Sequence, residues 1–177
     1  MGTFPGGNII RVTPTCTTDA LGSAGDVIFN SAEIPNAVSN RGGVSMLLGC
    51  YVIDYTDATN DLNIVLHETN GINIGPTDSS ATMNISDANM RLLKFIGRLQ
   101  IDAADTDFDM GGLKVLYAGN VNANTTADGV ESPVSPYPML LQAAGGSTSV
   151  YFSAATGTAE TFATDSLEFI FHIKYLG

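Results

Sequence analysis

The densest group of side chains that could do chemistry is a set of aspartates between residues 102 and 109. Asp105, Asp107 and Asp109 stand at alternate positions, and alternating carboxylates in a loop can direct several oxygens at one hard cation such as Ca²⁺. An EF-hand loop does not fit, because Met110 occupies the position where that loop needs glycine. The alternative is a solvated acidic turn whose carboxylates accept hydrogen bonds from nearby backbone N–H groups. Asp105, Asp107 and Asp109 are therefore a candidate calcium site, and no other cofactor is expected.

The two histidines, His67 and His172, both fall in strand-like runs. We interpret each as a hydrogen-bonded or outward-facing sheet residue, and a Ser-His-Asp triad would have to recruit one of them. The chain has no Gly-x-Ser-x-Gly elbow, and its glycine pairs lack the lysine that directly follows in a phosphate-binding loop. We therefore expect a protein that is not an enzyme, with a hydrolase that uses His67 or His172 as the minor alternative.

Two cysteines, Cys16 and Cys50, are too few to define a disulfide framework. Cys50 lies in an apolar run and is interpreted as a small buried hydrophobic residue. A bridge between Cys16 and Cys50 is the alternative.

The charge of the chain limits its partners. Seven basic and eighteen acidic residues give a formal net charge of −11, whereas binding to nucleic acid or to an anionic membrane depends on Lys and Arg. We therefore expect neither partner. Cations, less acidic protein surfaces and neutral ligands such as glycans fit this charge better.

The apolar residues fall into short runs that predict strands, separated by Gly, Asn, Asp, Ser and Thr. The run 44–55 is long and apolar enough to cross the centre of a sheet, with Gly49 at a bulge or bend. Alternation over 62–67 predicts a half-buried return strand that forms an antiparallel hairpin with it. The other predicted strands are 8–12, 26–30, 81–85, 95–101, 113–118, 137–143, 150–152 and 167–176.

One short helix is predicted near 86–95, because Ser86 can cap its N-terminus and Asp87 suits the positive end of its dipole. Many strands with long returning connections predict an all-β, single-domain, two-sheet sandwich, with a jelly roll favoured. An immunoglobulin-like sandwich is second, since the chain has no Trp. Residues 1–7 are expected to form a flexible N-terminal arm and residues 8–177 the sandwich domain.

Long neutral loops are predicted at 119–136 and 154–165, and such loops are usually functional or ordered by a partner. Tyr137 stands between two prolines and precedes Met139, and Tyr and Met are both favoured at interfaces. The alternative for Tyr137 is a turn before a strand. The residues expected at an interface, from the arm and from this segment, are Thr3, Phe4, Pro5, Asn8, Tyr137 and Met139.

Several segments of the chain resemble small β-rich virion structural proteins of tailed phages, especially phages of aquatic hosts. The segments are Gly25–Asn30, Glu33–Ala37, Gly42-Gly43, Val52–Tyr55 and Asn84–Ala88. The resemblance covers most of residues 8–118 and brings no catalytic residues with it. It implies a capsid decoration or cement protein, made in the host cytoplasm and placed on the exterior of the virion head. A position in a fibre, knob or neck is the alternative.

The leading hypothesis is thus a non-enzymatic decoration protein that bridges and stabilises subunits of the shell. Its expected partners are the major capsid protein or other virion proteins, and further copies of itself in a homo-oligomer, with a trimer favoured. Because few Lys and Arg are available to touch packaged DNA, we expect it outside the shell. The second hypothesis is a glycan-binding or adhesive jelly-roll module, assisted by Ca²⁺ through Asp105, Asp107 and Asp109.

Overall fold

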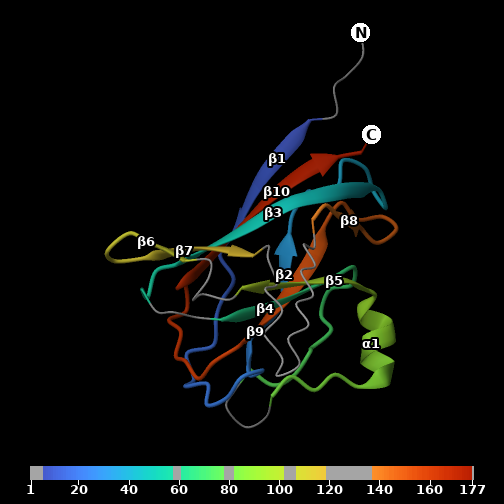
Figure 1. Cartoon of the computed structure of the whole chain (residues 1–177). Helices are drawn as coiled ribbons and strands as arrows, with labels where there is room; N and C mark the ends of the chain where they lie inside the picture. The colour runs from blue at the N-terminus through green and yellow to red at the C-terminus, as the bar shows by residue number, and fades with distance from the viewer. Residues whose placement is uncertain (1–5, 58–60, 78–81, 102–106, 119–136, 177) are drawn as a thin grey trace, which may run out of the picture.

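The fold is a sandwich of two antiparallel sheets with one helix (Figure 1). The computed structural model describes residues 6–57, 61–77, 82–101, 107–118 and 137–176. The six-stranded sheet contains β1 (Gly7–Val12), β3 (Val44–Asp54), β6 (Asp107–Asp109), β7 (Lys114–Ala118), β8 (Met139–Gln142) and β10 (Leu167–Tyr175). The four-stranded sheet contains β2 (Val27–Ile34), β4 (Leu62–His67), β5 (Phe95–Ile101) and β9 (Val150–Thr156).

The strand order is that of a jelly roll. The order β1-β10-β3-β8 stands in one sheet and β2-β9-β4-β5 in the other, which is the eight-strand, double Greek-key arrangement. The chain changes sheet at each connection except between β4 and β5 and among β6, β7 and β8. The β6–β7 hairpin is thus an addition to the eight strands, placed between β5 and β8.

Strand β3 organises the six-stranded sheet. Strand β10 pairs with nearly its whole length along one edge, while β8 pairs with its first half and β7 with its second half along the other edge. The register with β10 shifts between His172 and Ile173, opposite Leu47 and Gly49. Leu48 is the extra residue of this bulge, and Gly49 was expected to mark it.

The two sheets bury a core rich in phenylalanine. Phe29, Phe152, Phe169 and Phe171 come from β2, β9 and β10, and none is more than 4% exposed. Ring centroids lie 5.3 Å apart for Phe29 and Phe152 and 4.9 Å apart for Phe152 and Phe169, distances at which aromatic pairs attract each other. The first pair lies within the four-stranded sheet, and the second joins the two sheets across the sandwich.

The chain makes an excursion between β4 and β5, and its described residues, 68–77 and 82–94, pack on the outer side of the four-stranded sheet. The ends of this excursion meet through backbone bonds from Glu68 N to Lys94 O and from Thr69 N to Leu93 O. Helix α1 (Asp87–Leu93) begins at Ser86, whose side chain accepts the N–H of Asn89. A second apolar cluster, made of Val27, Val65, Ile74 and Leu93, holds the excursion against the sheet.

The predicted all-β, two-sheet sandwich is confirmed, as are the central strand and the short helix at 86–95. The predicted hairpin of 44–55 with 62–67 is wrong, because β3 and β4 belong to different sheets. In a jelly roll the connection between these strands crosses from one sheet to the other. The predicted strand at 81–85 is also wrong for its described part, where Thr82 makes an isolated bridge to Asp26 and residues 83–85 are not in a strand.

Other boundaries differ more modestly from expectation. Strand β9 extends to Thr156, so the predicted loop 154–165 begins later, and Phe162 within it is buried. Gly7, assigned to the arm, is the first residue of β1. The loop 119–136 lies outside the described residues. Cys16 and Cys50 are both buried and free, so the bridge between them is not formed.

The phenylalanine core should dominate stability. We expect Phe169→Ala to lower the free energy of unfolding by about 3–5 kcal/mol, because it removes a fully buried ring and leaves a cavity. The matched control is Phe95→Ala, whose ring is 49% exposed and whose loss should change stability by about 0.5 kcal/mol or less. Urea denaturation followed by circular dichroism measures both, and equal effects would contradict this assignment of the core.

Candidate interaction surfaces

The candidate calcium site is described only in part. Asp105 lies outside the described residues, and Asp107 is the first residue of β6. Asp109 ends β6, and its Oδ1 accepts the backbone N–H of Gly111 at 2.6 Å, as expected for an acidic turn. Within the described residues, no group of three or more His, Cys, Asp or Glu side chains could hold a metal ion.

The structure describes three of the six predicted interface residues. Thr3, Phe4 and Pro5 lie outside the described residues. Asn8 is exposed on β1, and its Nδ2 donates to the hydroxyl of Tyr175 at 3.1 Å.

Tyr137 and Met139, expected at the same interface, are half-buried and pack against the main core. The hydroxyl of Tyr137 donates to the carbonyl of Ala118. Burial, the largest cause, raises the pKa of Tyr137. Their apolar surface is therefore used mostly within the chain.

His67 is a structural residue of the four-stranded sheet. It is fully buried, with Nδ1 2.9 Å from the carbonyl oxygen of Thr69 and Nε2 3.0 Å from the hydroxyl of Ser153. A carbonyl can only accept, so Nδ1 carries the proton and neutral Nε2 accepts from Ser153. Ser153 in turn accepts the backbone N–H of Ser31. Burial lowers the pKa of His67, which favours this neutral, hydrogen-bonded form.

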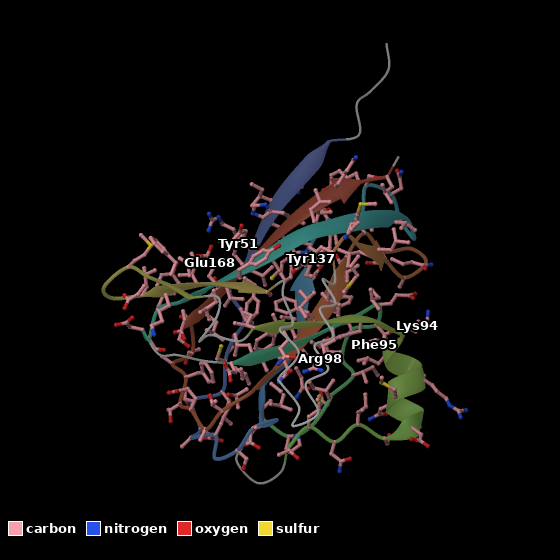
Figure 2. The ribbon with its side chains drawn as sticks, in the orientation of Figure 1. Tyr51, Lys94, Phe95, Arg98, Tyr137 and Glu168 are labelled. Carbon is pink, nitrogen blue, oxygen red and sulfur yellow. The ribbon has the colours of Figure 1, made fainter. Side chains whose placement is uncertain are left out.

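The exposed large apolar side chains gather in three places. The first is the outer face of the six-stranded sheet, the second surrounds α1, and the third is the β6–β7 hairpin; Leu176 stands apart near the C-terminus. On the six-stranded sheet they are Ile9, Val44, Leu48, Tyr51, Tyr55 and Leu140. Around α1 they are Met83, Met90, Leu92 and Phe95, and on the hairpin they are Phe108 and Met110. Figure 2 shows Tyr51 over the six-stranded sheet and Phe95 beside α1.

Alternation along β3 produces the first surface, which we call the outer face. Leu47, Cys50 and Val52 point into the core and are fully buried, so the residues between them point outward. The register then sets Tyr51 beside Tyr117 and Met46 beside Leu140 across the sheet. The rings of Tyr117 and His172 lie 5.0 and 5.4 Å from that of Tyr51. The outer face is therefore one continuous apolar and aromatic area.

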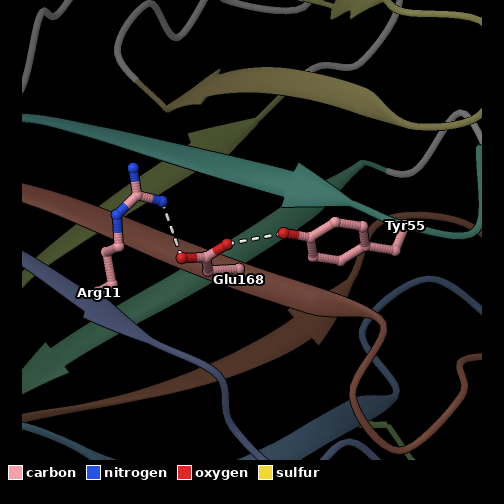
Figure 3. A network of polar contacts seen from close by, with 3 residues as sticks. All are labelled: Arg11, Tyr55 and Glu168. Atoms are coloured by element: carbon pink, nitrogen blue, oxygen red, sulfur yellow. Dashed lines mark hydrogen bonds and ion pairs between the residues drawn. The ribbon is translucent and has the colours of Figure 1, made fainter.

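A charged network crosses one side of the outer face (Figure 3). Glu168 Oε1 accepts from Arg11 Nη1, and its Oε2 accepts from the hydroxyl of Tyr55, both at 2.8 Å. The bonds from Arg11 and Tyr55 hold the pKa of Glu168 below its usual range. The network joins β1, β10 and the residue after β3 and keeps the carboxylate satisfied next to apolar side chains.

The outer face is comparable in size to the largest apolar patches found on monomeric proteins. Its six most exposed apolar residues are 37% to 60% exposed, and at roughly 150–200 Å² for each fully exposed residue they present on the order of 500 Å². The largest apolar patch of a typical monomer is about 300–600 Å² and is often functional. The outer face is at the upper end of that range.

The second surface is a groove between α1 and the four-stranded sheet, which we call the α1 groove. It measures about 400 Å³. Its lining residues are Val65, Ile74, Met83, Asn84, Ile85, Met90, Leu93, Phe95 and Arg98. Met90 and Phe95 are 40% and 49% exposed, while Ile74 and Leu93 form its buried floor.

One basic side chain, that of Arg98, lines this groove. Lys94 pairs with Glu68 at 2.8 Å, and Arg91 lines a separate hollow on α1 together with Asp87. In the part of the chain that the structure describes, Arg98 Nη2 donates to the neutral amide oxygens of Asn63 and Gln100, and no ion pair includes Arg98. The α1 groove is therefore apolar inside, with one guanidinium group at its margin.

Comparison of the chain with protein-family models, with curated proteins and with solved structures found no match. In the part of the chain that the structure describes, no helix has the length and apolar character needed to span a membrane.

Sequence reasoning did not identify either surface, although one signal for the outer face was present. In β3, Val44, Met46 and Leu48 are apolar on the face opposite the buried Leu47. A strand of a two-layer sandwich has one face in the core, so apolar residues on both faces indicate a second contact. The sequence contains no comparable indication of the α1 groove. Its lining residues come from β4, β5, α1 and the loops between them, and these segments meet only because the chain between β4 and β5 folds back on the sheet.

The burial of His67 has a consequence for stability. The pKa of His67 is lower in the folded protein than in the unfolded chain. As the pH falls below about 6.5, the ordinary histidine pKa, His67 is therefore protonated in the unfolded chain before it is protonated in the folded protein. Stability should therefore decline from that pH downward until the folded protein is protonated too. His67→Asn should cost about 1–3 kcal/mol at neutral pH through lost hydrogen bonds and should remove this part of the decline. Urea denaturation from pH 7.5 to 5 measures this pH dependence of the free energy of unfolding, with His172→Asn as the matched control. If His67→Asn showed the same pH dependence as the wild type, the buried neutral role of His67 would be refuted.

Proposed function

We propose that the protein is a non-enzymatic virion structural protein that decorates the exterior of a tailed-phage head and stabilises it by bridging subunits of the shell. The outer face carries the proposal, because it is a continuous exposed apolar area on a sandwich whose core is already well buried. Such an area is typical of a protein–protein contact. We assign to it the docking of the major capsid protein or another virion protein.

The arrangement of surfaces supports a bridging role. The outer face lies on the six-stranded sheet and the α1 groove on the side of the four-stranded sheet. A protein that links two neighbours needs two separate contacts, and these surfaces belong to different layers of one sandwich. The jelly-roll fold occurs in viral capsid proteins, and the resemblance to phage virion proteins, which covers most of residues 8–118, also agrees with this role.

The charge supports a place outside the shell. The net charge of −11 opposes binding to packaged DNA, since that contact depends on basic side chains. We further propose that the protein acts as a homo-oligomer, with a trimer favoured.

A glycan-binding or adhesive module is the second candidate, and one observation favours it. Tyr51, Tyr117 and His172 form an aromatic cluster on the outer face, and jelly rolls also occur in lectins. Binding to a glycan array that is lost on Tyr51→Ala, with no binding to heads, would favour this candidate over a decoration protein.

Add-back to phage heads that lack the protein tests the leading proposal. Leu48→Glu and Tyr51→Glu place a charge at the centre of the outer face and should weaken binding by roughly thirty-fold or more, as for an interface hot spot. Thr161→Glu, at an exposed position away from the three apolar groups, should bind like the wild type. The proposal would be contradicted if all three variants, folded by circular dichroism, occupied heads equally.

A further inference from the structure

The β6–β7 hairpin exposes apolar side chains that its own fold leaves uncovered. Phe108 and Met110 are 65% and 62% exposed. The turn between them and β7 is firmly held, because Met110 N donates to Leu113 O at 3.0 Å and Gly111 N donates to Asp109. Gly111 has a φ of +79°, which glycine adopts without strain. The hairpin therefore presents a phenyl ring and a thioether in a fixed arrangement.

The hairpin carries carboxylates beside its exposed ring, and the α1 groove has a guanidinium group in its lining. Asp107 and Asp109 flank Phe108 in the sequence, while Lys114 of the same hairpin is buried. The groove has an apolar interior with Met90 and Phe95 at its opening, and among the described residues the guanidinium of Arg98 bonds amide oxygens and no carboxylate. Aromatic and Met side chains are favoured in interface cores, and carboxylates are favoured partners of guanidinium groups. The two surfaces are complementary in both respects.

The same chain cannot make this contact with itself. Figure 1 shows the β6–β7 hairpin projecting at one side of the sandwich and α1 at the opposite side. A second copy can make it, and the charge of the chain favours this site. Two molecules of net charge −11 repel each other, so they approach most favourably where the few basic residues meet carboxylates. One of those basic residues, Arg98, lines the α1 groove.

We infer that the β6–β7 hairpin of one copy docks in the α1 groove of the next, with Phe108 and Met110 in the groove and Asp109 facing Arg98. The contact is heterologous, because each copy uses different surfaces for its two neighbours. Such a contact joins copies into a ring if the rotation closes and into an open filament if it does not, and a ring fits the proposed homo-oligomer. The inference rests on that proposed oligomer. Because the neighbouring copy occupies the α1 groove, the oligomer bridges subunits of the shell through the outer faces of its copies.

Two variants that block opposite halves of the contact test it. Phe108→Glu removes the hairpin ring but keeps the groove, and Met90→Glu places a carboxylate in the groove but keeps the hairpin. Ile9→Glu, at a residue 60% exposed on the outer face, is the matched control. Analytical ultracentrifugation of the full chain should show a closed oligomer for the wild type and for Ile9→Glu, and monomers for each of the other two variants alone.

An equimolar mixture of Phe108→Glu and Met90→Glu gives the sharpest result. One intact hairpin and one intact groove remain between them, so the mixture should form dimers and nothing larger. A monomeric wild type, variants that associate like the wild type, or a mixture that stays monomeric would each overturn the inference. Because binding to heads is measured separately with the outer-face variants, a monomer that still binds heads would refute this contact and leave the proposed function standing.

Discussion

The structure depends on the burial of aromatic rings between two sheets that the chain visits alternately. Phe29 and Phe152 of the four-stranded sheet contact Phe169 and Phe171 of the six-stranded sheet at 4.9 to 5.6 Å between ring centroids. Because the chain changes sheet at most connections, no sheet can form its core face without the other. The apolar inner faces of both sheets are therefore buried within one molecule, and the surfaces open to partners are the outward sides of the two sheets.

The chain covers the outward side of the four-stranded sheet but leaves that of the six-stranded sheet open. The four-stranded sheet is covered by residues 68–77 and 82–94, which bring Ile74 and Leu93 onto Val65 and leave the α1 groove at the margin. The six-stranded sheet has no such cover in the described residues, and its apolar side chains Leu48, Tyr51 and Leu140 stay open. An assembly protein would need this asymmetry, because it folds alone and still keeps apolar area for its neighbours.

Much of the fold could be predicted, since alternation and capping are local. The central strand, the bulge at Gly49 and the helix that begins at Ser86 all follow from neighbouring residues. The false hairpin of β3 with β4 shows the limit, because sheet membership depends on contacts far apart in sequence. The half-burial of Tyr137 has a similar cause, because its packing on the core is not revealed by its proline neighbours. The interface at Thr3, Phe4, Pro5, Asn8, Tyr137 and Met139 stays a prediction. The calcium site at Asp105, Asp107 and Asp109 stays a prediction.

The central claim is that the outer face is the surface by which the protein joins the virion. Hydroxyl-radical footprinting of the protein on intact heads and free in solution measures this directly, because it reports the solvent access of each side chain. Tyr51, Tyr55 and Leu48, which are 37% to 49% exposed in the free chain, should lose most of their reactivity on the head. Equal reactivity of these three residues in the two states would contradict the account.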